Sequence, residues 1–448
     1  MKSGALAQDT PAPANAALLR NVFALAAPTT FVAILQVIAQ LVETWLAARQ
    51  GTAALAGWAV ILPFALLMQQ MSTGAMGGGV VSAIARALGA SRTDEASSLV
   101  MHALMIALAA GLAFTFGLCL FGRPMLEAIA GPAAAEAAHL YVLLLFGLGA
   151  VPSWLANTLA SVLRGGGRHA LAARTLTLTW IIFPPLAWLL CEPAGMGLAG
   201  IGAAFALVFI AAALSMAVVV TRGGAGFMPV FRQKLTATLF KRILAIGATA
   251  CALAAIANLT TILVTRQLRE YGTAAVAAYG ISARLEFLII PLAFGVGSAL
   301  TALVGKAAGG NDWLTARRLA WLGGIVTFAA TALLGLAVAL NSGRFAAFFT
   351  QDVQVSAIAS TALSFIGPAF GGLGLGMALY FASMGAGRMK WPVIAALSRI
   401  GLAVGGGWLF ADVAGMGMSG HFLGVALGLV TYGLCGAIGV RRSVWSAR

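Results

Sequence analysis

The sequence predicts an all-α membrane protein with twelve transmembrane helices, arranged as two pseudo-symmetric lobes of six helices each. Three observations support this prediction: an apolar composition, twelve apolar segments long enough to cross a bilayer, and short motifs that recur about 220 residues apart. Because six is an even number, both halves enter the membrane in the same orientation. The two lobes are therefore expected to form a parallel repeat.

The composition excludes an ordinary soluble domain. The chain has 448 residues, of which 61% are hydrophobic and only 9% are charged, whereas a soluble domain carries about 25% charged residues. So few charged residues are expected when most of the protein surface faces lipid and not water. The four cysteines are widely separated with no CxxC spacing, so we expect neither disulfides nor a metal site.

A spanning helix needs about 20 mostly apolar residues, and twelve segments meet this condition. They cover residues 22–48, 53–85, 96–121, 135–162, 170–190, 198–220, 240–265, 274–305, 316–340, 355–386, 391–411 and 417–440. We therefore divide the chain into a disordered cytoplasmic tail (1–20), an N-lobe (21–221), a cytoplasmic linker (222–237) and a C-lobe (238–448).

The basic residues indicate the orientation of the spans. Most Lys and Arg residues fall in the N-tail, the C-tail and the loops on the same side, and only Arg284 and Arg399 are assigned to spans. Cytoplasmic loops collect Lys and Arg, so both termini are predicted to be cytoplasmic. The same distribution explains the net charge of +15 without a nucleic-acid partner.

The repeat is visible in paired motifs. GTAALAG at 51–57 matches GTAAVAA at 272–278, GGGR at 165–168 matches GAGR at 385–388, and AGMGLAG at 194–200 matches AGMGMSG at 414–420. Each match alone is weak in a chain rich in Gly and Ala. Their order and nearly constant offset predict equivalent turns in the two lobes.

Only two acidic residues fall within the predicted spans, Glu43 and Glu286. An ionisable group in a span is unfavourable in lipid and commonly faces a cavity. Gln36, Gln40 and Glu43 share one helical face, and burial there favours the protonated carboxyl. A cation nearby would favour the ionised form instead.

The second stripe surrounds Glu286. Tyr279, Ser282 and Glu286 are spaced three and four residues apart, whereas Arg284 is expected on the opposite face. Asn258 and Thr261 form a further polar stripe in the seventh span. We predict Glu43 and Glu286 as ion-coupling residues. The predicted substrate cavity comprises Gln36, Gln40, Asn258, Thr261, Tyr279, Ser282 and Arg284.

Several motifs resemble a known family. They are VETWLAARQGTAALAG at the end of the first span, ARALGA after the Gly-rich second span, LRGGGR after the fourth, and YGISARLEFLIIPLAFGVGSALTALVGKAAGG in the second half. Together they resemble the multidrug and toxic compound extrusion (MATE) family of the multidrug/oligosaccharidyl-lipid/polysaccharide exporter superfamily. The resemblance covers nearly the whole chain.

The resemblance implies a V-shaped central cavity between two lobes and export of cationic, amphipathic compounds in exchange for H⁺ or Na⁺. It also implies a coupling acid on the first span, where Glu43 stands. Some members carry further acids on the fifth, seventh or tenth span. This chain has none there, which leaves H⁺ and Na⁺ both open, with H⁺ preferred.

Other function classes receive less support. A flippase for a lipid-linked saccharide is expected to line its cavity with several cations, and only two arginines were assigned to spans. An intramembrane enzyme is disfavoured because no HExxH, GxSxG or Walker A motif is present. We therefore expect a monomeric multi-pass exporter of the inner (plasma) membrane, with small organic cations and lipid as partners and no cofactor, metal or nucleic acid.

Overall fold

The computed structural model describes residues 14–231, 234–441 and 445, and this part of the chain contains helices and no strands. The N-lobe consists of α1 (Asn15–Arg49), α2 (Thr52–Gln70), α3 (Met76–Gly89), α4 (Thr93–Ala130), α5 (Pro132–Val142), α6 (Ala150–Gly165), α7 (His169–Cys191) and α8 (Leu198–Thr221). The C-lobe consists of α9 (Ala237–Leu268), α10 (Thr273–Gly309), α11 (Trp313–Leu340), α12 (Ser342–Phe349), α13 (Val353–Ile366), α14 (Phe370–Ala386), α15 (Lys390–Ile400) and α16 (Met418–Gly439).

The prediction of twelve spans is confirmed within the described residues. Eleven helices or joined helices are long and apolar enough to cross a membrane. The twelfth is the pair Pro132–Leu148 and Ala150–Gly165, which bends by 41°. Several spans contain π-helical turns, such as Met71–Ala75 between α2 and α3. The other predicted segments match a helix to within a few residues, but α1 begins at Asn15 and not at residue 22, and α4 continues to Ala130 and not to residue 121.

The start of α1 differs from the predicted tail. Helix α1 begins at Asn15, whereas residues 1–20 were expected to be disordered; residues 1–13 lie outside the described part of the chain. Leu18 and Val22 are buried in an apolar cluster together with Leu319 of α11. These contacts explain why the helix extends toward the N-terminus.

The backbone confirms the repeat. Gly51 (φ 94°, ψ 167°) and Gly272 (φ 97°, ψ 173°) precede α2 and α10 with the same conformation. Gly197 (φ 57°, ψ −140°) and Gly417 (φ 57°, ψ −142°) do the same before α8 and α16. These conformations are nearly restricted to glycine. The paired sequence motifs therefore encode the same turns in both lobes.

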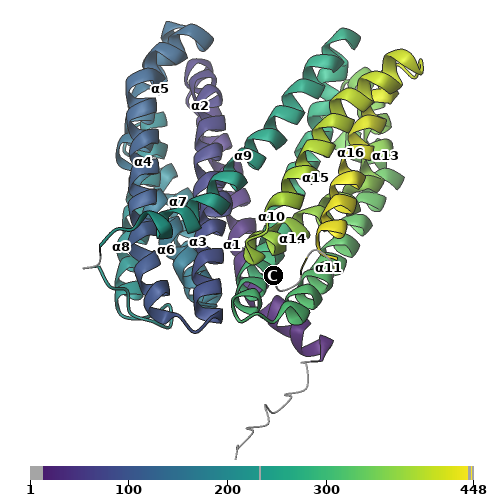
Figure 1. Ribbon diagram of the computed structural model, residues 1–448. Helices are drawn as coiled ribbons and strands as arrows, with labels where there is room; N and C mark the ends of the chain where they lie inside the picture. The colour runs from purple at the N-terminus through teal and green to yellow at the C-terminus, as the bar shows by residue number, and fades with distance from the viewer. Residues whose placement is uncertain (1–13, 232–233, 442–444, 446–448) are drawn as a thin grey trace, which may run out of the picture.

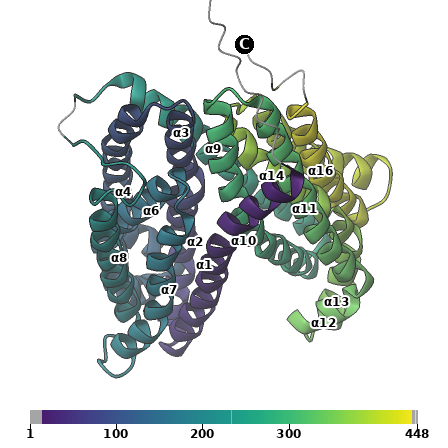
Figure 2. The same ribbon diagram turned by 90° about the horizontal axis from the view of Figure 1, so that it is seen from below.

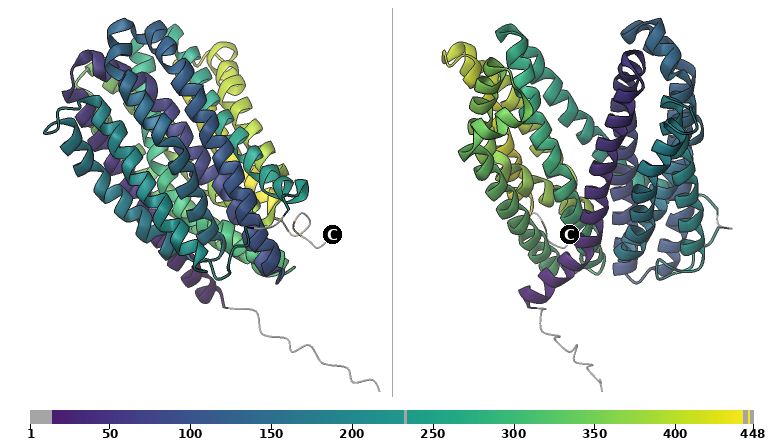
Figure 3. Two further views of the ribbon diagram at one scale, coloured as in Figure 1. Left: turned by 90° about the vertical axis from the view of Figure 1, so that its left-hand side faces the viewer. Right: turned by 180° about the vertical axis from the view of Figure 1, so that it is seen from behind.

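The two lobes meet at one end of the molecule and diverge at the other (Figure 1). The linker between the lobes and the start of α1 lie at the end where they meet. Viewed from that end, α1 begins beneath the C-lobe and runs toward the outer end of the N-lobe (Figure 2). The two side views show the same crossing (Figure 3). Accordingly, Leu46 near the end of α1 packs in the N-lobe core.

Glycines allow the lobes to approach each other closely where they meet. A Cβ on Gly89 of α3 would lie 1.9 Å from the carbonyl oxygen of Lys306 in α10, and a Cβ on Gly309 would lie 2.1 Å from that of Arg86. The two backbones are therefore in direct contact. We call Gly79, Gly89, Gly247, Gly305 and Gly309 the glycine seam, because each contacts the opposite lobe at this end.

Polar contacts accompany the glycine seam. The hydroxyl of Ser82 in α3 donates a hydrogen bond to the carbonyl oxygen of Met384 in α14 at 2.6 Å. Glu95 of α4 forms an ion pair with Arg242 of α9. Both contacts join the N-lobe to the C-lobe.

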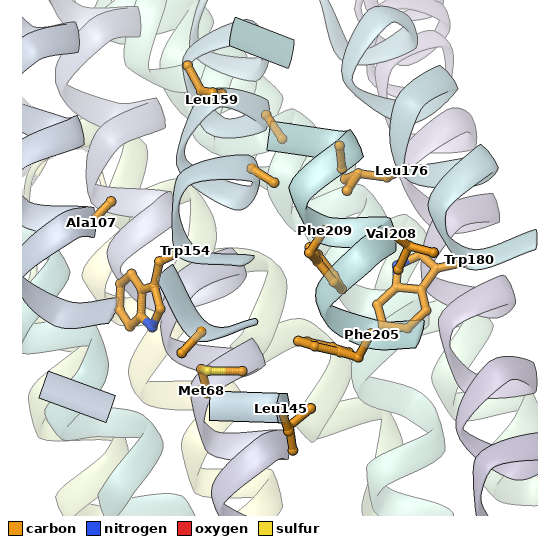
Figure 4. Close-up of a cluster of buried hydrophobic side chains, with 14 of the residues drawn as sticks. Met68, Ala107, Leu145, Trp154, Leu159, Leu176, Trp180, Phe205, Val208 and Phe209 are labelled. Atoms are coloured by element: carbon orange, nitrogen blue, oxygen red, sulfur yellow. The ribbon is translucent and has the colours of Figure 1, made fainter. Parts of the chain in front are cut away.

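The interior of the N-lobe is filled by large aromatic side chains (Figure 4). Trp180 of α7 packs edge-on against Phe209 of α8 with ring centroids 5.6 Å apart, and Phe205 lies 4.5 Å from Phe209. Trp154 of α6 is fully buried. Such close packing makes the lobe a stiff unit.

The glycine seam can be tested by adding one methyl group. We expect Gly89→Ala to lower the free energy of unfolding by about 1–3 kcal/mol, because its Cβ collides with backbone that cannot move alone. Gly117→Ala in α4 is the control. Nothing lies within 4 Å of its Cβ, so it should raise helix stability by about 0.5–1 kcal/mol. Unfolding of the purified protein in detergent measures both, and equal effects would contradict the seam.

Candidate functional site

Glu43 lies on the inner face of α1 in the outer half of the N-lobe. Its carboxylate Oε1 accepts hydrogen bonds from Trp58 Nε1 of α2 at 3.0 Å and from the Tyr141 hydroxyl of α5 at 3.2 Å. Trp58 is 5% exposed and Tyr141 is fully buried. The carboxylate is thus enclosed by three helices of one lobe.

The orientation of α1 follows from its sequence pattern. The polar stripe of Gln36, Gln40 and Glu43 faces away from Ile38, Leu41 and Trp45, which are at least half exposed. Because lipid accepts exposed apolar side chains, the stripe must turn toward the protein. Gln36 and Gln40 therefore follow Glu43 along one face, although only Glu43 contacts Trp58 and Tyr141.

Helix α1 is also anchored at its last turn. Arg49 Nε donates to Glu192 Oε1 at 3.0 Å, and Gln50 Nε2 donates to the same oxygen at 3.2 Å. The hydrogen bond from Arg49 holds the pKa of Glu192 below its ordinary value. These contacts tie the helix end, six residues beyond Glu43, to the turn that follows α7.

A buried polar network lies deeper in the N-lobe, at the π-helical turn Met71–Ala75. Asn157 Nδ2 of α6 donates to Gln69 Oε1 at 3.2 Å and to Ser72 Oγ at 2.9 Å. Gln69 Nε2 donates to Ser153 Oγ at 3.1 Å. All four residues are buried, so the network fixes α6 against the second span.

Arg164 corrects the assignment of arginines made from the sequence. Its motif, LRGGGR, follows the predicted fourth span, yet Arg164 lies within α6 and is only 3% exposed. Its Nη2 donates to Ser161 Oγ at 3.2 Å, and its guanidinium lies 5.7 Å from the ring centroid of Phe294 in α10. Among the described residues no carboxylate pairs with it. Arg164 is therefore a buried arginine of the fourth span, whereas the sequence predicted it in the following loop.

The C-lobe holds its own polar cluster. Glu286 of α10 forms an ion pair with Arg399 of α15, and their side chains are 14% and 12% exposed. The guanidinium of Arg399 therefore neutralises the Glu286 carboxylate. The Arg399 guanidinium lies 5.9 Å from the ring centroid of Tyr432 in α16. Tyr279 is buried beside this pair, and the hydroxyl of Thr261 in α9 donates to the Ala257 carbonyl of its own helix.

No hydrogen bond or ion pair among the described residues joins the remaining candidates of the C-lobe to Glu286 or Arg399. Asn258 Nδ2 donates to the Ala254 carbonyl of its own helix at 3.0 Å. The hydroxyl of Ser282 is buried without a hydrogen-bond partner. Arg284 is exposed, and it lies eleven residues, about three turns, from Gly295, whose Cβ position meets Thr30 of α1. Arg284 is therefore on the side of α10 that faces α1.

The two carboxylates in the spans differ in how they are held. Glu286 is neutralised by a guanidinium, whereas Glu43 receives only neutral donors. Protonation of Glu43 leaves no buried cation unpaired, so this group can gain and lose a proton at small energetic cost. Within residues 14–231, 234–441 and 445, no three His, Cys, Asp or Glu side chains group as metal ligands would.

Sequence reasoning missed Tyr141 and the burial of Arg164. A hydroxyl-bearing aromatic residue in an apolar span was the only signal for Tyr141, and nothing in its spacing related it to Glu43, 98 positions earlier. Arg164 looked like a loop residue because it stands beside three glycines. Both roles depend on how distant helices pack.

Comparisons with known proteins agree with this geometry. The MatE family model matches residues 28–189 and 245–409. A probable multidrug resistance protein NorM of Xanthomonas campestris pv. campestris is 25% identical over 372 residues, which cover 79% of this chain and 78% of the relative. A protein of the same description from Xylella fastidiosa is 32% identical over 106 residues, which cover 24% of this chain and only 22% of the relative's length.

Solved structures show the same fold. A MOP superfamily transporter from Pyrococcus furiosus superimposes with a TM-score of 0.87 at 20% identity, covering 97% of this chain and 98% of that one. The Vibrio cholerae MATE transporter VcmN in its bent form gives a TM-score of 0.87 at 20% identity, covering 96% and 98%. At this identity, the likeness concerns the fold alone.

The ion pair in the C-lobe provides a test of the site. We expect Glu286→Gln or Arg399→Met alone to lower the free energy of unfolding by about 3–5 kcal/mol, because each leaves one buried charge without its partner. The double variant should be nearly as stable as wild type. Denaturation of the four proteins in detergent measures the coupling, and additive effects of the two single changes would contradict it.

Proposed function

The chain belongs to the MATE family of transporters, which are not enzymes, and from this premise we propose that it exports cationic, amphipathic organic compounds in exchange for protons. The multidrug resistance names of its relatives support the substrate class. We place it as a multi-pass protein in the plasma membrane of its cell, in keeping with its bacterial relatives.

The enclosure of Glu43 is the observation that carries the proposal. A carboxylate held by Trp58 and Tyr141 can bind a proton when the site is open to one side and lose it when the site opens to the other. A cationic substrate in the same lobe favours the ionised form. Proton and substrate then compete for the site, and they cross the membrane in opposite directions.

The donors around Glu43 favour H⁺ over Na⁺. The indole nitrogen of Trp58 is a donor only and offers no lone pair to a cation. It points at the carboxylate oxygen that a sodium ion would need. A proton adds to a carboxylate without several oxygen ligands around it, so proton coupling suits this site better.

The alternative of a flippase for a lipid-linked saccharide receives less support. Such a substrate is anionic and calls for uncompensated cations along its path. Arg399 is neutralised by Glu286, and Arg164 is buried at the joint between the lobes. Arg284 is then the one exposed arginine of these three, which favours a cationic substrate.

The proposal predicts the effect of one substitution. We expect Glu43→Gln to abolish ethidium transport driven by a proton gradient, because an amide cannot exchange a proton. Proteoliposomes with separate H⁺ and Na⁺ gradients measure this. Glu136→Gln, which removes an exposed carboxylate of α5, is the control and should keep most of the activity. Gradient-driven transport by Glu43→Gln, or transport driven by Na⁺ alone, would contradict the proposal.

Alternating access predicts that the lobes must separate at the glycine seam. A Cβ on Gly305 would lie 3.0 Å from the Cβ of Ala85, close to the separation of about 3.8 Å in a disulfide. In a variant without the four native cysteines, we expect Ala85→Cys with Gly305→Cys to cross-link on oxidation and to stop transport until it is reduced.

Each single-cysteine variant serves as a control and should transport before and after oxidation. Full transport by the cross-linked protein would show that the seam does not open during the cycle.

A further inference from the structure

A cavity of about 490 Å³ lies at the end of the molecule where the lobes meet, away from Glu43 and Glu286. It is formed by the start of α1, the start of α11 and the residues that follow α16. Figure 2 shows the start of α1 beside α11 on this side of the C-lobe. Neither the proposed proton site nor the polar networks account for it.

The cavity is lined by cations without acids. Its charged lining residues are Arg317, Arg318 and Arg441. None of the ion pairs between described residues includes any of them. The nearest acid along the chain, Asp312, accepts from the backbone of Thr315 at 2.9 Å and caps α11. Three positive charges thus share one hollow with no carboxylate among its lining residues.

One of these arginines is held in place. Arg317 Nη1 donates to the carbonyl oxygen of Trp445 at 2.7 Å, and Arg317 and Arg318 are both half-buried. A guanidinium has five donors, so the bond to Trp445 leaves most of those on Arg317 available. Fixed guanidiniums match the oxygens of a phosphate group.

The apolar part of the lining adjoins the arginines. On α11, Leu314, Arg318 and Leu322 are four residues apart, and Arg317 and Trp321 form a parallel row. The arginines lie in the first turns of a spanning helix, and Leu322 lies about one turn deeper. The hollow therefore offers charge at the level of the lipid headgroups and apolar surface at the level of the acyl chains.

We propose that this cavity binds an anionic phospholipid, with its phosphate on Arg317, Arg318 and Arg441 and the beginning of an acyl chain along Leu314, Trp321 and Leu322. Basic pockets between spanning helices commonly hold such headgroups. A soluble phosphate would use the arginines but would leave the apolar rows uncovered. The continuity of charged and apolar lining favours the lipid.

Because of where the cavity lies, a bound lipid would affect how the two lobes are held together. Asn15 of α1 lines it, and Leu18 of the same helix is buried against the C-lobe. A lipid that contacts both α1 and α11 stabilises the seating of α1 beneath the C-lobe. Binding should therefore raise the thermal stability of the conformation described here.

The test uses the full-length protein in detergent, supplied with phosphatidylglycerol, phosphatidylcholine or the soluble headgroup glycerol 1-phosphate. We expect phosphatidylglycerol alone to bind in native mass spectrometry and to raise the melting temperature. Arg317→Gln, Arg318→Gln and Arg441→Gln together should weaken this binding by about 100-fold. The matched control changes Arg168 and Arg174 of the N-lobe and Arg222 at the start of the linker to Gln. All three are exposed, and this variant should bind as wild type.

Equal binding by the triple variant and the control would overturn the proposal, as would equal effects of phosphatidylglycerol and phosphatidylcholine. If glycerol 1-phosphate bound and raised the melting temperature as much as phosphatidylglycerol does, the site would be one for a soluble phosphate, and the lipid proposal would be overturned. Should the triple variant fail to fold, Arg318→Gln alone is expected to weaken binding about five-fold, and unchanged binding would count against the site.

Discussion

The structure depends on backbone-to-backbone contact between α3 of the N-lobe and α10 of the C-lobe. A side chain on Gly89 or Gly309 would collide with the opposite helix, so no larger residue allows the two helices to lie so close. This contact joins the lobes at one end and leaves the other ends free to diverge. Glycine is suited to such a joint in lipid, because close van der Waals packing and not the hydrophobic effect holds helices together there. In the proposed cycle the same joint must also open. It is suited to this because it consists of packing with few polar bonds, Ser82 to Met384 and Glu95 to Arg242 among them.

The two lobes have the same backbone fold but differ in where their ionisable side chains lie. At the offset that relates Gly51 to Gly272, the position equivalent to Glu43 is Val264, and the position equivalent to Glu286 is Ala65. Each of these two acids therefore stands at a place where the other lobe has an apolar residue. One acid is held by neutral donors and the other by a guanidinium. Two copies of a fold have thus diverged, with a titratable group in the N-lobe and a permanent ion pair in the C-lobe.

The sequence predicted those features that depend on local composition. Apolar length identified the spans, and the recurring glycines identified the turns, because a positive φ restricts the residue at the turn itself. Ser91 and Asn311 adopt the same positive φ at equivalent positions, 57° and 60°, although neither is glycine and no motif marked them. Tyr141 beside Glu43 and the buried guanidinium of Arg164 were not predictable. Their surroundings come from helices far apart in the chain, and a single sequence carries no record of which faces meet.

Helix α1 is the element that can connect a proton to the movement of the lobes. Its first turns are buried against the C-lobe, and its last turns are bound within the N-lobe, with Pro28 between them. Hydrogen bonds to a charged carboxylate are stronger than those to a neutral one. In the proposed cycle, an ionised Glu43 therefore holds the outer half of α1 to α2 and α5 more firmly than a protonated Glu43 does. A ligand shifts a conformational equilibrium only when its affinity for the two conformations differs. In the proposed cycle, the affinity of Glu43 for a proton differs between the two conformations because α1 changes its contacts to α2 and α5 when the lobes move. Because α1 alone among the N-lobe helices begins beneath the C-lobe, a change in its contacts to α2 and α5 reaches the joint between the lobes directly.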